Sequence, residues 1–159
     1  MAEKIDYITG DLLESDELVI VHGCNAQGTM GSGIAGLIRK KWPVVFDQYR
    51  QHYETHLGED IMGEIVWVDV GTKLIANAIT QRFYGGNKGM RYCSYDAIAT
   101  VFDRLDIWAS ENSVERIGMP LIGCGLANGS WKVVSAIIES SAQNYQPVVY
   151  LLDGQIPTT

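Results

Sequence analysis

The sequence predicts an α/β protein in which one central sheet is covered by helices on both faces. Apolar runs of strand length alternate along the chain with longer amphipathic segments. Two glycine-rich loops follow such runs and lead into helices, an arrangement typical of ligand-binding α/β sheets. With 159 residues and no linker or repeat, we expect one domain over residues 1–152 and a loose tail over 153–159.

The first half of the chain predicts four strands and two helices. Residues 4–8 alternate in polarity, and three short apolar runs indicate buried strands. A helix that ends at Pro43 is followed by a second with apolar residues near helical spacing. The strands are expected at residues 4–8, 18–21, 65–68 and 74–79, and the helices at 37–42 and 44–56.

The second half adds two helices and two strands. Ile98, Val101, Phe102 and Leu105 recur at helical spacing within one long segment. Asn128 or Ser130 is expected to cap the last helix. The helices are expected at residues 92–109 and 130–142, and the strands at 116–119 and 148–152.

Composition limits the class of protein. Apolar residues make up 47% and charged residues 19%, which is typical of a globular domain, and no apolar run approaches the ~20 residues of a membrane span. A net charge of −7 disfavours broad nucleic-acid binding. Three scattered cysteines and a polar start at residues 1–4, without a signal peptide, predict a reduced cytoplasmic protein, which we expect to be monomeric.

Loop one, residues 28–36, and loop two, residues 120–129, are the glycine-rich segments on which a ligand site is expected. Main-chain N–H groups in such loops, together with those of a helix N-terminus, bind anions. Loop one contains four glycines and no Lys or Arg, so a phosphate would be held by the main chain. Two such loops side by side would clasp a diphosphate.

Known nucleotide motifs fit poorly. No Gly-x-x-x-x-Gly-Lys-[Ser/Thr] occurs, which excludes a P-loop. Residues 31–36 spell Gly-x-Gly-x-x-Gly, but they lie about ten residues beyond the strand, without the acidic partner of a dinucleotide fold. His52 and His56 are four residues apart, but no third ligand is near in sequence, so neither a metal nor a cofactor is expected.

Five motifs together resemble the macrodomain family, over about residues 4–152. They are Thr9-Gly10-Asp11-Leu12, Val21-His22-Gly23-Cys24-Asn25, the segment 28–35, Phe83-Tyr84-Gly85-Gly86, and Met119 to Leu126 with Trp131. The resemblance implies a three-layer α/β/α fold with a mixed central sheet of about six strands. Within the family, the chain looks most like the small stand-alone proteins that dephosphorylate ADP-ribose 1″-phosphate.

The resemblance also implies a site for ADP-ribose and its 1″-phosphate as small-molecule ligands. Asp11, in the turn with Leu12, would bond the adenine amino group, and Asn25 would face the distal ribose. Tyr150 or Leu152 would border the adenine, although a tyrosine in such a strand is often part of the core. Loop one would wrap the distal ribose through Gly31, Ser32, Gly33 and Ile34. Loop two would hold the diphosphate through Gly123, Cys124, Gly125, Leu126 and Ala127, with Tyr84 also placed at the ligand.

His22 and Asn25 are the expected catalytic residues for hydrolysis of the phosphomonoester. A histidine near its ordinary pKa of ~6.5 can shuttle a proton or attack phosphorus. A purely structural His22 and an inert Cys24 are the plainer alternatives. Because a regular strand would point His22 and Asn25 to opposite faces, we expect a twist or bulge at Gly23.

Two other functions remain open: a reader that binds ADP-ribose without chemistry, and a hydrolase that removes ADP-ribose from protein or nucleic acid. A related macrodomain branch removes ADP-ribose from glutamate with a Lys after the fourth strand and an Asp in loop two. Gln81 and Ala127 occupy those places here, and neither forms a Schiff base or transfers a proton. This departure favours the phosphatase.

Overall fold

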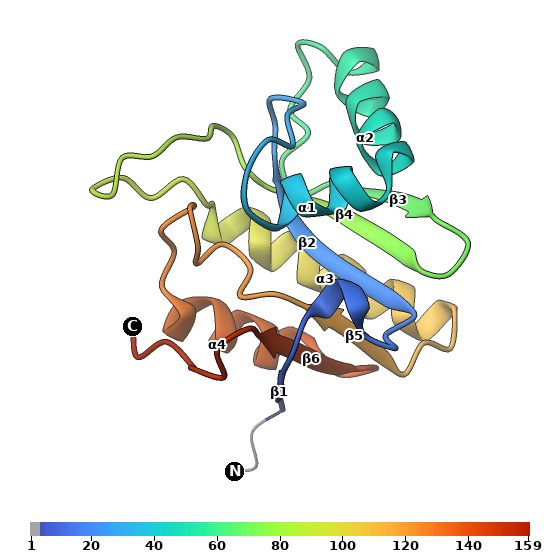
Figure 1. Cartoon of the computed structure of the whole chain (residues 1–159), viewed down its shortest axis with the longest axis vertical. Coiled ribbons are helices and arrows are strands. Elements are labelled where there is room, and N and C mark those ends of the chain that lie inside the picture. The colour runs from blue at the N-terminus through green and yellow to red at the C-terminus, as the bar shows by residue number, and fades with distance from the viewer. Residues whose placement is uncertain (1–3) are drawn as a thin grey trace.

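The computed structural model describes residues 4–159 as one six-stranded sheet between helices (Figure 1). Residues 1–3, which bear on the expected lack of a signal peptide and on the start of the domain, lie outside this range. The strands are β1 (Asp6–Thr9), β2 (Val19–Asn25), β3 (Ile65–Asp69), β4 (Leu74–Gln81), β5 (Arg116–Met119) and β6 (Gln146–Leu151). The helices are α1 (Gly33–Lys41), α2 (Pro43–Thr55), α3 (Tyr95–Glu111) and α4 (Trp131–Ser141), with a short 3₁₀ turn η1 (Leu12–Glu14).

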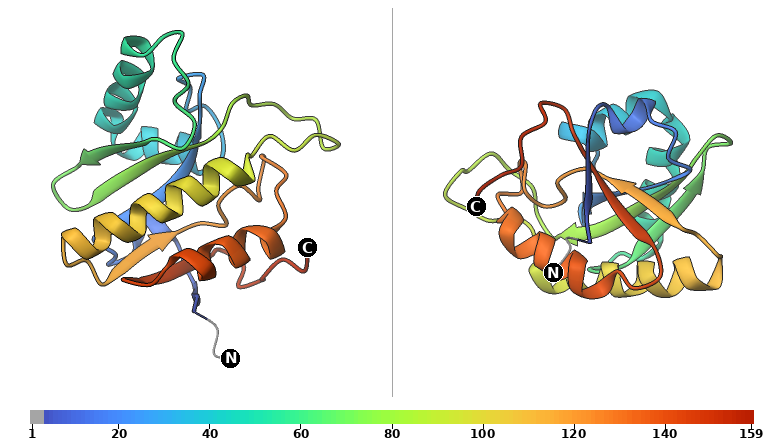
Figure 2. Two further views of the ribbon diagram at one scale, coloured as in Figure 1. Left: turned by 180° about the vertical axis from the view of Figure 1, so that it is seen from behind. Right: turned by 90° about the horizontal axis from the view of Figure 1, so that it is seen from below.

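The sheet order is β1-β6-β5-β2-β4-β3, and it confirms a mixed sheet. Every pair is parallel except β3 with β4, which are antiparallel. Helices α3 and α4 lie together on one face, and α1 and α2 cover part of the other (Figure 2). The three layers and the order of strands and helices agree with the sequence-based prediction.

Two apolar clusters fill the space between the layers. One lies between the sheet and α3 and α4, and includes Val21, Phe102 and Trp131. The other lies between the sheet and η1, α1 and α2, and includes Ile20 and Tyr49. Strand β4 is buried on both faces because helices cover it on both sides.

Several boundaries differ from the prediction for local reasons. Helix α1 begins at Gly33 rather than at residue 37, so the second half of loop one is already helical. Helix α3 begins at residue 95 because the Ser94 hydroxyl accepts a hydrogen bond from the N–H of Ala97. Of the two expected caps for α4, it is Ser130 that accepts a bond from its helix, at Val133 N–H.

Residues 153–159, the expected tail, contain no helix or strand, and their end contacts the domain. The carbonyl of Thr159 accepts a hydrogen bond of 2.9 Å from the N–H of Trp131, the first residue of α4. Residues 153–159 therefore fold back toward that helix. Within residues 4–159, the helices are too short or too polar to cross a membrane.

Candidate functional site

Loops one and two lie side by side at the carboxyl edge of the sheet. β2 and β5 are neighbours, so the loops that follow them leave the same edge. A Cβ placed on Gly33 would lie 3.7 Å from Leu126 Cδ1, which brings the two loops into contact. The two loops are therefore adjacent, as expected, and that adjacency is the geometric requirement for a site shared between them.

Both loops present main-chain N–H groups that the protein does not use. At the start of α1, the Gly36 N–H is the first to donate a hydrogen bond to the preceding loop, at the Ser32 carbonyl. The Ser32 side chain makes no capping hydrogen bond with the helix. Within residues 4–159, the N–H groups of Gly33, Gly125 and Leu126 have no hydrogen-bond acceptor, and these three residues are exposed. Unpaired donors at a helix start favour a bound anion.

Loop two is held by hydrogen bonds within itself and to the segment before α3. Gly123 has a φ of +75°, and its carbonyl accepts a bond of 2.6 Å from Gly129 N–H. The carbonyl of Ala127 accepts a bond of 2.8 Å from Tyr92 N–H, and its side chain is buried. The Cys124 thiol turns inward to the carbonyl of Ile122, at 3.4 Å. The side chains of Cys124 and Ala127 therefore turn toward the protein, and only their main chain would be available to a ligand in this loop.

Tyr84 lies in an exposed segment that borders loop two. Its side chain is exposed, and among residues 4–159 its hydroxyl has no hydrogen-bond partner. Asn128 ties that segment to loop two by donating to the carbonyls of Met90 (2.7 Å) and Asn87 (3.0 Å). The structure thus brings the segment near the site without placing Tyr84 on it.

His22 lies beneath α1 and α2, out of reach of solvent. Its side chain is 0% exposed, and Nε2 lies 2.6 Å from Oδ1 of Asn77. Burial lowers the pKa of His22 to about 4, although the bond to Asn77 acts in the opposite direction. The ring is therefore neutral at neutral pH, and this environment supports the structural alternative rather than a proton shuttle at the ligand.

Asn77 is a partner that the sequence reasoning missed. It is fully buried on β4, and its amide also donates to the carbonyl of Val66. Asn77 is the one polar residue within the apolar run 74–79. Because buried polar groups require hydrogen-bond partners, this position could have indicated a buried partner for another polar side chain. The Cys24 Sγ lies 3.6 Å from His22 Nε2. Burial raises the pKa of the Cys24 thiol far above its ordinary range, which agrees with the alternative of an inert cysteine.

The Asn25 amide is committed to the turn that opens loop one. Its oxygen accepts bonds from Tyr49 O–H (2.8 Å) and Gln27 N–H (2.9 Å). Its nitrogen donates to the carbonyl (3.1 Å) and hydroxyl (2.9 Å) of Thr29. With these bonds in place, the side chain shapes the loop instead of offering a free group to a ligand.

The twist or bulge expected at Gly23 is found one residue further along β2, between Cys24 and Asn25. Cys24 pairs with Ile79 but Asn25 pairs with Gln81, so the register shifts between Cys24 and Asn25. The extra residue is Thr80 on the neighbouring strand. A Cβ on Gly23 would lie 2.7 Å from the Thr80 hydroxyl, so the glycine makes room for that side chain rather than for a bend.

Asp11 and Tyr150 share the wall of a cavity of about 570 Å³ beside β6. Asp11 is exposed, and one of its oxygens caps η1 by accepting a bond from Leu13 N–H at 3.0 Å. Tyr150 is partly buried and lines this cavity. The Leu12 side chain is buried in the core, so only its main chain can reach a ligand.

A second cavity, of about 540 Å³, lies against loop one. Gly31, Arg39 and Phe46 line it, and the Arg39 guanidinium stacks 3.6 Å from the centre of the Phe46 ring. Loop one itself has no cation, so Arg39 supplies positive charge beside it. Within residues 4–159, no three His, Cys, Asp or Glu side chains are arranged to hold a metal ion.

The Macro domain family model matches residues 21–138, which is most of the chain and includes both loops. The chain belongs to the Macro domain family. This finding confirms the resemblance to the macrodomain family that the five sequence motifs indicated.

Relatives of this Macro domain protein have names that refer to ADP-ribose. It is 29% identical to the ADP-ribose glycohydrolase OARD1 of Bos taurus, covering 94% of this chain and 92% of that protein. It is 27% identical to an ADP-ribose 1″-phosphate phosphatase of Candida albicans, covering 85% and 92%. The macrodomain of Mycobacterium tuberculosis DarG superposes with a TM-score of 0.79 at 26% identity, covering 92% and 96%.

Proposed function

We propose that this Macro domain protein binds ADP-ribose between loops one and two and hydrolyses ADP-ribose 1″-phosphate to ADP-ribose and phosphate. The observation that carries the proposal is the pair of facing loops with unused N–H donors at Gly33, Gly125 and Leu126. Such donors match a diphosphate, which offers several anionic oxygens in a row.

The sheet order supports one orientation of the ligand. Asp11 follows β1, loop two follows β5 and loop one follows β2, and these strands lie in the order β1-β6-β5-β2. Three strand spacings amount to roughly 14 Å, a length that suits an extended ligand with a base at one end. The base would enter the cavity at Asp11 and Tyr150, and the distal ribose would lie at loop one.

Main-chain electrostatics would supply most of the catalysis. Phosphomonoesters react slowly, and preorganised donors aimed at the phosphate oxygens stabilise the charge that develops there. His22 is buried and Asn25 is bonded within the protein, so neither side chain is given a role in proton transfer. Burial raises the pKa of the Cys124 thiol to about 12, which makes it a weak nucleophile.

A hydrolase that acts on ADP-ribosylated protein or nucleic acid is the second candidate, because several relatives are named as glycohydrolases. The residues at the positions used by the glutamate-specific branch favour this second candidate less. Gln81 donates its amide to the carbonyl of Phe83, and Ala127 has no ionisable group. Neither residue supplies the acid–base or covalent chemistry of the glutamate-specific branch.

Binding and turnover test the proposal separately. ADP-ribose at a hundredfold excess over its Kd should raise Tm by roughly 5–10 °C, since a ligand selective for the native state stabilises by about 2.7 kcal/mol. Phosphate release from ADP-ribose 1″-phosphate should then be measured beside ADP-ribose release from modified protein and modified DNA. An unchanged Tm contradicts the ligand, and a stabilised protein with no phosphate release contradicts the reaction.

A further inference from the structure

Glu17 is a buried carboxylate in the cavity wall for which the proposed reaction gives no role. Its side chain is 5% exposed. Glu17 precedes β2 in the chain, and its side chain packs over Gly118 of the neighbouring strand β5. A Cβ on Gly118 would come within 2.8 Å of Glu17 Cγ and 3.0 Å of Leu12 Cδ1. Burying a carboxylate destabilises a protein unless hydrogen-bond donors surround it, so Glu17 needs donors in this wall.

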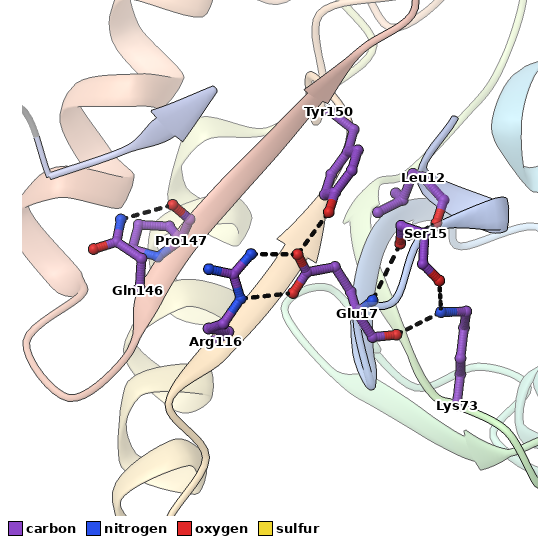
Figure 3. A network of polar contacts seen from close by, with 8 residues as sticks. All are labelled: Leu12, Ser15, Glu17, Lys73, Arg116, Gln146, Pro147 and Tyr150. Carbon is purple, nitrogen blue, oxygen red and sulfur yellow. Dashed lines mark hydrogen bonds and ion pairs between the residues drawn. The ribbon is translucent and has the colours of Figure 1, made fainter. Parts of the chain in front are cut away.

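Two side chains from different strands satisfy the Glu17 carboxylate (Figure 3). Arg116, at the start of β5, bonds it with both a guanidinium Nη2 (2.6 Å) and its Nε (3.1 Å). Tyr150, near the end of β6, donates its hydroxyl to the same carboxylate at 2.6 Å. The Arg116 guanidinium and the Tyr150 hydroxyl thus both donate to the Glu17 carboxylate. The bond to Glu17 fixes the direction of the Tyr150 ring.

The ionisation states strengthen this arrangement. Burial alone would raise the pKa of Glu17, but the hydrogen bonds from Arg116 and Tyr150 outweigh it and hold that pKa below its ordinary value. Burial and the bond to Glu17 raise the pKa of Tyr150. At neutral pH the carboxylate is charged and the phenol is protonated, so Tyr150 is the donor.

The main chain around Glu17 continues the same network to Asp11. Lys73 Nζ donates to the carbonyls of Ser15 and Glu17, each at 2.5 Å. The Ser15 hydroxyl donates to the carbonyl of Leu12 at 2.6 Å, within the turn that Asp11 caps. A continuous series of bonds therefore joins the Tyr150 ring to the Asp11 turn, and these are two walls of one cavity.

We propose that Glu17 is a positioning residue that holds the Tyr150 ring and the Asp11 turn in register and thereby sets the preference for adenine over other purines. The inference rests on the proposed function, in which this cavity takes the base. Glu17 itself does not touch the ligand. Its effect is on selectivity, which a residue important only for folding would leave unchanged.

The test compares the affinities for ADP-ribose and for its inosine counterpart, in which a carbonyl replaces the adenine amino group. The wild-type protein should prefer ADP-ribose, and Glu17→Gln should reduce the ratio of the two Kd values by about tenfold, the worth of one charge-assisted hydrogen bond. Tyr150→Phe, which keeps the ring, should reduce it similarly. The double variant should lose no more than the more affected single variant, because both changes act on the one bond between Tyr150 and residue 17.

Glu115→Gln is the matched control, since Glu115 is an exposed residue next to Arg116. Its carbonyl accepts a bond from Gln146 N–H, and within residues 4–159 its side chain makes no hydrogen bond. Its Kd ratio should equal that of the wild type. If Glu17→Gln does not fold, Tyr150→Phe decides the question, because Glu17 then keeps both bonds to Arg116. An unchanged ratio in a variant that binds ADP-ribose overturns the positioning role, whereas a wild-type protein that binds neither ligand overturns the proposed function.

Discussion

Gly125→Val is expected to weaken ADP-ribose binding by about 10- to 100-fold without unfolding the protein. Gly125 is exposed in loop two, its φ is not in the left-handed region, and a Cβ there would meet no atom within 4 Å. A branched side chain would therefore fit the empty protein. It would intrude where the proposed diphosphate meets the main chain, and overpacking typically costs ~1–3 kcal/mol.

Calorimetric titration of ADP-ribose measures this loss, and thermal unfolding without ligand checks the fold. Thr72→Val is the control because Thr72 is exposed and lies in the turn between β3 and β4, at the opposite edge of the sheet from both loops. Both variants should unfold within a few degrees of the wild type. Equal ADP-ribose affinity in Gly125→Val and Thr72→Val would remove loop two from the binding site.

The second large effect is a loss of stability in mild acid that depends on His22. The native protein holds this histidine neutral, with a pKa of about 4, while the unfolded chain has a value near 6.5. Below pH 6.5 the unfolded state therefore binds a proton that the native state does not, so the free energy of unfolding falls as the pH falls. Between pH 7 and pH 4.5 this linkage removes about 2–3 kcal/mol.

Urea unfolding at both pH values, for the wild type and for His22→Gln, isolates this contribution. Glutamine does not titrate and retains a donor for the Asn77 oxygen. Carboxylates that titrate in both proteins, including Glu17, cancel in the difference between the two pH dependences. The wild type should lose about 2–3 kcal/mol more than the variant over this interval, and an equal loss would contradict a buried neutral His22.

His22→Ala, in contrast, should act mainly on folding. It leaves a cavity and an unpaired Asn77 oxygen, and together these cost about 2–5 kcal/mol. A lower rate of phosphate release in this variant therefore needs to be expressed per folded molecule. A hundredfold fall in kcat for fully folded His22→Gln would instead restore the proton-shuttle hypothesis.

The sequence alone determined the order of strands and helices and the two glycine-rich loops. Periodicity, glycine, proline and helix caps are local signals, so residues such as Pro43 and Ser130 indicate the structure of their own segment. The Asp11 turn and loops one and two were also found from local motifs. Parallel strands then bring such loops to one edge of the sheet, which is why the outline of the site was predictable.

Only the tertiary structure decided what the side chains do. His22 was expected at the ligand, but its environment comes from Asn77, 55 residues away, and from the helices that bury it. Glu17 had no visible role in the sequence because its partners, Arg116 and Tyr150, lie 99 and 133 residues away. Burial and long-range hydrogen bonds set the ionisation and direction of these groups, and both arise only when distant segments pack together.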